Sequence, residues 1–312
     1  MSKVFTEDLK KLFGGQRYHS ISTWLKDEFG CKTIKLAIDG GFTCPNRDGT
    51  LGFSGCTFCS QSGSGEFAEG SCSSILQQLE LAKGRVSPKN KDGRYIAYFQ
   101  SFTNTYAPVA RLEQLFSEAI SPDYIAGLSI GTRPDCLEDD KIALLTELNR
   151  IKPVQIELGL QTIKDSTARY IRRGYPLSTF DDAMKRLKAA GLETVVHMII
   201  GLPGETAEDM KRTARYISDS GADGIKLQLL HILKDADIYN DYIAGKVQVL
   251  EMDEYINILI GCLMELRQDI IIHRLTGDGA KSKLVAPLWS ADKKRVLNTI
   301  RRELAAHNIS CQ

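Results

Sequence analysis

Three cysteines in one short stretch are the residues with the clearest capacity for chemistry. Cys44, Cys56 and Cys59 lie within the sixteen residues CPNRDGTLGFSGCTFC. This spacing is compatible with structural zinc, with a disulfide or packing cysteines, or with an iron–sulfur cluster held by three thiolates. A zinc site would need a fourth ligand, from His19, Cys31 or Cys72. A 4Fe–4S cluster has four irons, so three thiolates would leave one iron open to a substrate or cofactor.

The residues around the cysteines favour the cluster. Glycines occupy positions 40, 41, 49, 52 and 55. Glycine lets a backbone pass close to a cluster and point N–H groups at its sulfurs. Phe58 lies between the last two cysteines, where it could shield the cluster or pack beneath a bound base. In a reducing compartment, clustered cysteines also bind metal more often than they form structural disulfides.

The composition is that of a globular protein without an overall basic field. The chain has 312 residues, of which 43% are hydrophobic and 25% charged, with 40 Lys and Arg against 39 Asp and Glu. Any nucleic-acid contact must therefore come from local patches. No apolar run reaches the roughly 20 residues of a membrane span, and the N-terminus lacks the apolar core of a secretory signal. We expect a cytoplasmic protein that does not contact a membrane.

Short apolar, β-branched runs alternate with helical patterns along the chain. Strands buried on both faces are expected at 33–39, 95–100, 124–132, 153–161, 194–202 and 224–233. Helices are expected at 110–120, 137–151, 179–191 and 206–221. The last of these has Thr206 as its N-cap and Asp209 three residues later. This order predicts a parallel sheet with right-handed crossovers and ligands at the carboxyl ends of the strands.

Three regions are expected on this basis. Residues 1–32 form a helical N-terminal extension, and residues 33–235 form an incomplete α/β barrel of six βα units. Residues 236–312 form a C-terminal α/β extension that closes the barrel and contacts substrate. It comprises a helix at 251–268, a further strand at 269–277 and a basic helix at 291–307.

The cysteine loop and four later segments together resemble the radical S-adenosylmethionine (SAM) superfamily. The commonest signature of that superfamily is C-x3-C-x2-C after the first strand of a partial (β/α)6 barrel. The longer spacer found here resembles the elongator-type branch, and the whole chain resembles the bacterial YhcC/YtqA-type radical SAM proteins. The later matches, in the expected order, are GTRPD (131–135), ELGLQT (157–162), IRRGY (171–175) and HMIIGLPGET (197–206).

The resemblance implies a partial (β/α)6 radical SAM barrel with two cofactors. Cys44, Cys56 and Cys59 would hold a 4Fe–4S cluster, and SAM would bind at its open iron. A reductant protein such as flavodoxin or ferredoxin would supply the electron that cleaves SAM to methionine and a 5′-deoxyadenosyl radical. The residues expected at the cofactors are Phe58, Gln100, Ser101, Thr103, Asn104, Glu157, Gln161, Arg173, His197, Ile199, Gly201 and Leu202.

One motif departs from the family. The Gly-Gly-Glu turn that holds the SAM ammonium in many members is replaced by YFQSFTNTYAP (98–108). Gln100, Ser101, Thr103 and Asn104 are polar, but none is a carboxylate. Side-chain and backbone carbonyls would then have to accept from the ammonium.

Three residues of the matched segments have two interpretations each. Burying the Glu157 carboxylate in an apolar strand costs free energy unless it has a partner. It therefore either accepts a hydrogen bond from SAM or is ion-paired or solvated. Arg173 would pair with the SAM carboxylate through its planar guanidinium, with Arg172 as the alternative. His197 is either a SAM contact or a satisfied core residue.

Candidate catalytic residues are Gln228, His231 and Asp278. Gln228 and His231 are three residues apart, so strand alternation puts them on opposite faces, although His231 near the strand end could still reach the site. Asp278 belongs to HRLTGDG (273–279), which either closes the barrel mouth over substrate or is an ordinary turn.

Local basic groups around 10–19, 83–94 and 291–302 are either solvated faces or contacts for RNA phosphates. The elongator-type branch is associated with the wobble uridine of tRNA. The resemblance thus implies remodelling of a carbon-5 substituent in the aminomethyl-2-thiouridine pathway, such as carboxymethylaminomethyl to aminomethyl. Only 77 residues follow residue 235, so no acetyltransferase domain is expected. The alternatives are a radical SAM enzyme acting on a small metabolite or porphyrin-like substrate, and a zinc-stabilised binding module.

Overall fold

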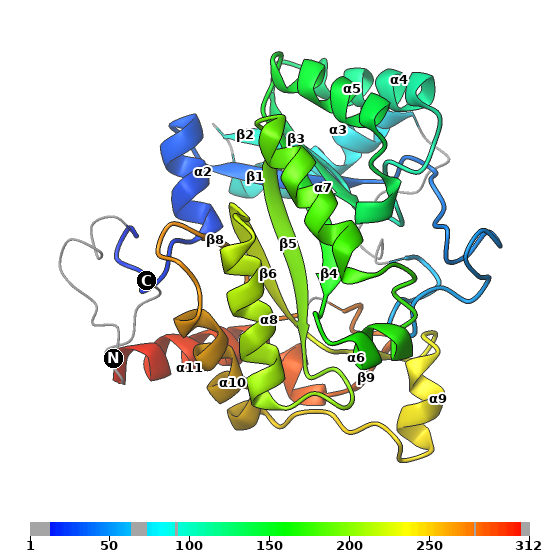
Figure 1. Cartoon of the computed structure of the whole chain (residues 1–312). Coiled ribbons are helices and arrows are strands. Elements are labelled where there is room, and N and C mark those ends of the chain that lie inside the picture. The colour runs from blue at the N-terminus through cyan, green and yellow to red at the C-terminus, as the bar shows by residue number, and fades with distance from the viewer. Residues whose placement is uncertain (1–12, 64–73, 91–92, 278, 307–312) are drawn as a thin grey trace.

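Seven parallel strands form one curled sheet, an open half-barrel that runs through the centre of the molecule (Figure 1). The computed structural model describes residues 13–63, 74–90, 93–277 and 279–306. Strand order follows the chain, which confirms the expected partial barrel, and the further strand expected at 269–277 is its seventh member. The strands are β1 (Thr33–Ile38), β2 (Arg94–Phe99), β3 (Ile125–Thr132), β4 (Val154–Gln161), β5 (Glu193–Ile200), β6 (Gly224–Leu229) and β8 (Ile271–Arg274).

The crossover helices cover the outer face of this sheet, with α7 and α8 lying across it in Figure 1. They are α3 (Ile75–Val86), α4 (Val109–Ile120), α5 (Asp139–Asn149), α6 (Asp165–Tyr170), α7 (Leu177–Ala189) and α8 (Ala207–Asp219). Their apolar sides pack on the sheet. For example, the ring centroids of Phe99 on β2 and Phe116 on α4 are 5.0 Å apart. The four predicted helices are confirmed to within two residues at either end. Neither α3 nor the six-residue α6 was predicted.

The last expected strand of the barrel divides in two. β6 ends at Leu229, and Ile232–Leu233 form β7, which pairs antiparallel with β9 (Leu284–Ala286) in a separate small sheet. The sequence does not mark the break because both pieces are apolar and buried. His231 consequently lies between two strands, where alternation no longer decides which way it faces.

The two extensions meet at the open side of the half-barrel. Helix α2 (Ile21–Phe29) contacts the edge strands β1 and β8, and the Ile272 N–H donates to the carbonyl of His19 at 2.8 Å. The remaining helices are α9 (Ile238–Ile243), α10 (Met252–Met264) and α11 (Lys293–Ala306), and short 3-10 turns occur at Ser87–Lys89, Pro134–Cys136 and Leu288–Ala291. Within the described residues, no helix is both long and apolar enough to cross a membrane. The domain boundaries at 32 and 235 stay predictions.

The cap of α8 is a testable link between sequence and stability. Thr206 accepts from the Asp209 N–H, and Asp209 reciprocates at the Thr206 N–H. Thr206→Ala should lower the free energy of unfolding by about 1 kcal/mol because a helix N–H loses its acceptor. Thr206→Ser keeps the hydroxyl and should retain most of that stability. Denaturant titrations of the two variants measure the difference, and equal losses would assign the effect to the threonine methyl group instead.

Candidate active site

The cysteine loop follows β1 and is held in shape mainly by Asn46 and Arg47. The Asn46 amide donates to the carbonyl of Arg172 at 2.7 Å and to Cys56 Sγ at 3.4 Å. The Arg47 guanidinium donates to the Ser60 carbonyl at 2.6 Å. A side chain on Gly55, which has a φ of +74°, would meet Arg47 Nε at 2.7 Å. The eleven-residue spacer is therefore an ordered turn that returns Cys56 toward the segment around Arg172.

Two arginines, Arg133 and Arg173, hold that segment in place. Arg173 is buried and donates to the carbonyl of Thr162, which follows β4, at 2.6 Å and to that of Tyr175, which precedes α7, at 3.1 Å. Arg133 donates to the Arg173 carbonyl at 2.9 Å and pairs with Asp135 at 2.7 Å. Both guanidinium groups lie over the Tyr175 ring. The Arg173 guanidinium thus ties backbone ends together here, and its contact with the SAM carboxylate stays a prediction.

The thiols of Cys56 and Cys59 interact directly. A hydrogen bond from Cys59 lowers the pKa of Cys56 to about 7 against the effect of burial, with Arg133 contributing. The same bond, together with burial, raises the pKa of Cys59 well above its usual value. A cysteine that is partly thiolate near neutral pH is suited to bind metal.

No three His, Cys, Asp or Glu side chains in the described residues are grouped to hold one metal ion. A zinc ion needs its ligands within about 2.0–2.3 Å of a single point. Cysteines that bind a 4Fe–4S cluster each reach a different iron. Of the possible fourth zinc ligands, Cys72 lies outside the described residues.

A deep cavity opens beside the cysteine loop and extends into the half-barrel. It encloses about 1480 Å³, counting the part open to solvent. It brings together most of the residues expected at the cofactors and both described catalytic candidates. These are Cys44, Cys56, Phe58, Cys59, Gln100, Thr103, Glu157, Gln161, Arg173, His197, Ile199, Gln228 and His231.

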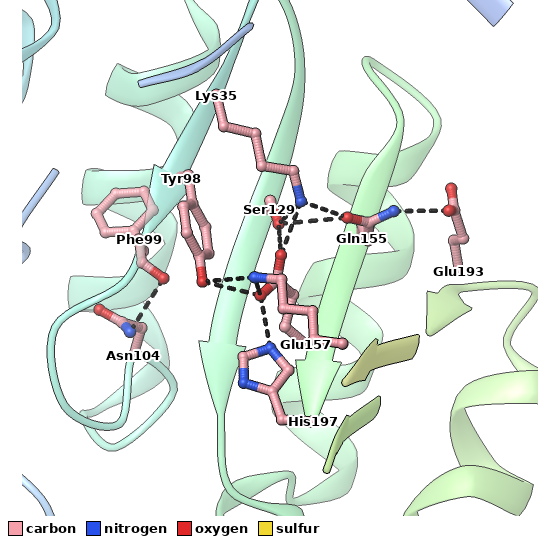
Figure 2. A network of polar contacts seen from close by, with 10 residues as sticks. Lys35, Tyr98, Phe99, Asn104, Ser129, Gln155, Glu157, Glu193 and His197 are labelled. Carbon is pink, nitrogen blue, oxygen red and sulfur yellow. Dashed lines mark hydrogen bonds and ion pairs between the residues drawn. The ribbon is translucent and has the colours of Figure 1, made fainter. Parts of the chain in front are cut away.

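The other expected residues do not line the cavity. Ser101, Asn104, Gly201 and Leu202 are buried behind its wall. The Asn104 amide joins β2 to β3 by donating to the carbonyls of Phe99 at 3.2 Å and Gly131 at 2.7 Å, and Figure 2 shows the first of these bonds. Asp278 lies outside the described residues, so its role stays a prediction.

The floor of the cavity is a polar network centred on the carboxylate of Glu157 (Figure 2). One oxygen accepts from Lys35 Nζ at 2.7 Å and Ser129 Oγ at 3.0 Å. The other accepts from Tyr98 and His197 Nε2, both at 2.8 Å, and from Lys226 Nζ. This network satisfies the expectation that Glu157 has partners, and the partners belong to the chain itself.

The network sets the charges on the cavity floor. Burial alone would raise the pKa of Glu157, but Lys226 and Lys35 outweigh it and hold this pKa well below its usual range. Burial, with Lys226 nearby, lowers the pKa of His197 to about 4. Glu157 is therefore a carboxylate and His197 a neutral ring that donates from Nε2, which leaves Nδ1 as an acceptor.

Sequence reasoning missed Lys35, Tyr98 and Lys226 in this network, and Asn46 and Arg47 in the cysteine loop. A signal existed for the lysines. Each stands inside a strand that carries no other charge, in TIKLAI and GIKLQL, as Glu157 does in VQIELGLQ. Three such charges predict a buried ion-pair network when read together.

Among the cavity residues, Gln161 gives the clearest indication that a ligand binds there. Its φ is +70°, a conformation that side chains rarely adopt without compensation. Its Oε1 is buried, and no hydrogen-bond partner for it exists among the described residues. A buried carbonyl oxygen without a donor is costly, so Gln161 is suited to accept from a molecule bound in the cavity.

Known proteins are similar to this chain in sequence and in fold. A family model described as the radical SAM superfamily matches residues 43–217, and the model of its C-terminal domain matches residues 222–306. The chain is 42% identical to YtqA of Bacillus subtilis over 289 residues, which are 93% of this chain and 90% of YtqA. This chain belongs to the radical SAM superfamily. The expected similarity to the YhcC/YtqA-type radical SAM proteins is confirmed.

Two further similarities extend the comparison. The solved structure of archaeal Methanocaldococcus infernus Elp3, lacking its N-terminus, aligns with a TM-score of 0.67 and 16% identity. The alignment covers 89% of this radical SAM chain and 64% of Elp3, and it shows a shared fold. The tRNA uridine(34) acetyltransferase of Methanocaldococcus jannaschii is 26% identical over 135 residues, 42% of this chain and 24% of that protein.

Radical SAM proteins bind a 4Fe–4S cluster and SAM, and this chain takes the same cofactors. The cavity fits both groups. Three thiols stand along one side of it, with Cys56 partly ionised near neutral pH. The unpartnered oxygen of Gln161 and the apolar side chains of Phe58 and Ile199 line the same space.

His197 offers a test of the electrostatics. Its folded-state pKa of about 4 lies below the ordinary 6.5, so the unfolded chain takes up the proton first. The contribution of His197 to stability should be complete above about pH 6.5 and lost as the pH falls toward 4. NMR titration of labelled histidine, with His197→Gln to assign the signal, measures this pKa. A His197 signal that titrates near 6.5 would contradict the assignment.

Proposed function

We propose that this radical SAM enzyme remodels the carbon-5 side chain of the wobble uridine of tRNA, in the aminomethyl-2-thiouridine pathway. The observation that carries the proposal is the cavity itself. Three thiols lie along one side of it, and a charged network lies at its floor, so a substrate group can enter between them. The partial similarity to tRNA uridine(34) acetyltransferase supports a uridine substrate.

The roles proposed for the chain's own residues follow from their places. Cys44, Cys56 and Cys59 ligate the cluster, and Gln161 accepts a hydrogen bond from SAM. Once bound, the two cofactors supply a 5′-deoxyadenosyl radical when one electron arrives, with flavodoxin or ferredoxin as the proposed donor. Phe58 and Ile199 form apolar walls that exclude water from the reacting groups.

Other residues of the cavity are placed to contact substrate. Gln228 and His231 both line it, since β6 ends between them. Ser101, Asn104, Gly201 and Leu202 lie behind the wall, and we propose that they hold the cavity-lining residues beside them in position.

A second, basic groove supports an RNA partner. It runs between residues 16–22, β8 and α11, and Lys293, Arg301 and Arg274 contribute to its walls. None of the described residues that line it is acidic. Arg274 lines both this groove and the cavity, so the two are adjacent. A polyanion bound along the groove would pass close to the candidate active site, and such binding weakens steeply with salt.

The cluster assignment can be tested by anaerobic reconstitution. Wild-type protein should bind about four irons per chain with matching sulfide, and Cys56→Ser should lose most of this iron because a thiolate ligand is gone. Cys31→Ser is the matched control, since Cys31 precedes β1 and should leave iron content unchanged. One tightly bound zinc with no reductive SAM cleavage would overturn the proposal.

The substrate can be tested in cells. Deleting the gene should change the wobble-uridine nucleosides of total tRNA, with a carboxymethylaminomethyl form accumulating at the expense of the aminomethyl form. Liquid chromatography with mass spectrometry of digested tRNA measures both. Complementation by the wild-type gene, but not by Cys56→Ser, is the control. An unchanged wobble-uridine profile, with SAM cleavage intact in the purified protein, would point instead to a small-molecule substrate.

A further inference from the structure

Positive charge exceeds negative charge at the floor of the cavity. Lys35 and Lys226 share the single carboxylate of Glu157, and the imidazole of His197 is neutral. Buried charges are costly unless they are paired, and here two ammonium groups share one carboxylate.

A second cation stands beside Lys226. Arg274 on β8 is the register partner of Lys226 on β6, and both side chains line the cavity. Like charges on adjacent strands repel each other. Burial lowers the pKa of Lys226 to about 7 against the attraction of Glu157, and repulsion from Lys35 and Arg274 adds to the effect. An anion between the two side chains would turn this repulsion into two attractive contacts.

Lys226 has a donor available for such an anion. Its ammonium donates to Glu157 and to the Tyr98 hydroxyl, the latter at 3.1 Å. An ammonium has three N–H donors, and the described part of the chain supplies no third acceptor. Because Lys226 lines the cavity, the third donor can reach a bound molecule.

We propose that the cavity floor is a binding site for a carboxylate carried by the substrate, held by Lys226 with Arg274 beside it. A carboxylate would accept from the third N–H of Lys226 and stabilise its charged form. This inference deepens the proposed function and rests on it: the modified uridine would be selected by the negative end of its side chain.

The site is separate from the place where SAM meets the cluster. Lys226 lies three residues before the end of β6, which puts it about 10 Å below the carboxyl end of that strand. The cysteine loop follows the carboxyl end of β1. The floor can therefore hold a substrate group while the cofactors occupy the mouth.

The test compares two RNAs that differ only in one charge. Anticodon stem-loops carry 5-carboxymethylaminomethyluridine or its neutral methyl ester at the wobble position. Binding to the reconstituted enzyme is measured anaerobically without reductant, so that no turnover occurs. Wild-type enzyme should bind the acid at least about 10-fold more tightly than the ester, as expected for a charged hydrogen bond.

Variants assign that preference to Lys226. Lys226→Met should bring the ratio of the two affinities close to one, whereas Lys226→Arg should keep most of it. Lys211→Met is the matched control, since it removes a surface lysine of α8 that pairs with Glu208, and it should keep the wild-type ratio. Thermal unfolding of each variant confirms that it is folded before binding is compared.

The outcomes separate this inference from the proposed function. Equal binding of both RNAs by the wild type overturns the carboxylate site alone, and it needs no variant that might misfold. If neither RNA binds, the tRNA proposal fails together with the inference. If Lys226→Met weakens both RNAs equally, the lysine has a structural role and does not recognise the carboxylate.

Discussion

The buried carboxylate of Glu157 is the interaction on which the interior of the half-barrel depends. It stands on β4 and collects donors from β1, β2, β3, β5 and β6, and so joins six of the seven strands at one point (Figure 2). Losing one partner of a buried ion pair costs about 3–5 kcal/mol because the other is left without counter-charge. An apolar interior would avoid that cost, and in the proposed function the polar interior admits a charged group of the substrate.

The mouth of the cavity is held together differently, by side chains that donate hydrogen bonds to backbone carbonyls. Asn46, Arg47, Arg133 and Arg173 all donate to carbonyls of loops that have no strand partner. Buried backbone groups need such partners, and an arginine can serve several at once. This explains how an eleven-residue spacer between cysteines is compatible with a fixed site. The spacer contributes Asn46 and Arg47, which fold it onto the turn that contains Arg173.

The sequence predicted the fold well but the site only in part, because local patterns are visible in a sequence and contacts between distant side chains are not. Strands β1 to β6 and the larger helices depend on local hydrophobic period and capping, which a sequence displays directly. The division of the last run into β6 and β7 was missed because burial is the same on both sides of the break. The Glu157 network was missed because it depends on side chains up to 191 residues apart, from Lys35 to Lys226.

These two levels of the cavity divide the chemistry between them. The mouth carries thiols and apolar side chains, which suit the cofactors, whereas the floor carries charges. Glu157 and His197 of the floor belong to the segments ELGLQT and HMIIGLPGET, and Lys35 and Lys226 lie outside the short segments that resemble the family. With the proposed carboxylate site, the shared motifs would serve radical formation, and the two mid-strand lysines would select the substrate. A radical SAM barrel could change its substrate by exchanging such inward-facing residues, without disturbing the loops that hold its cofactors.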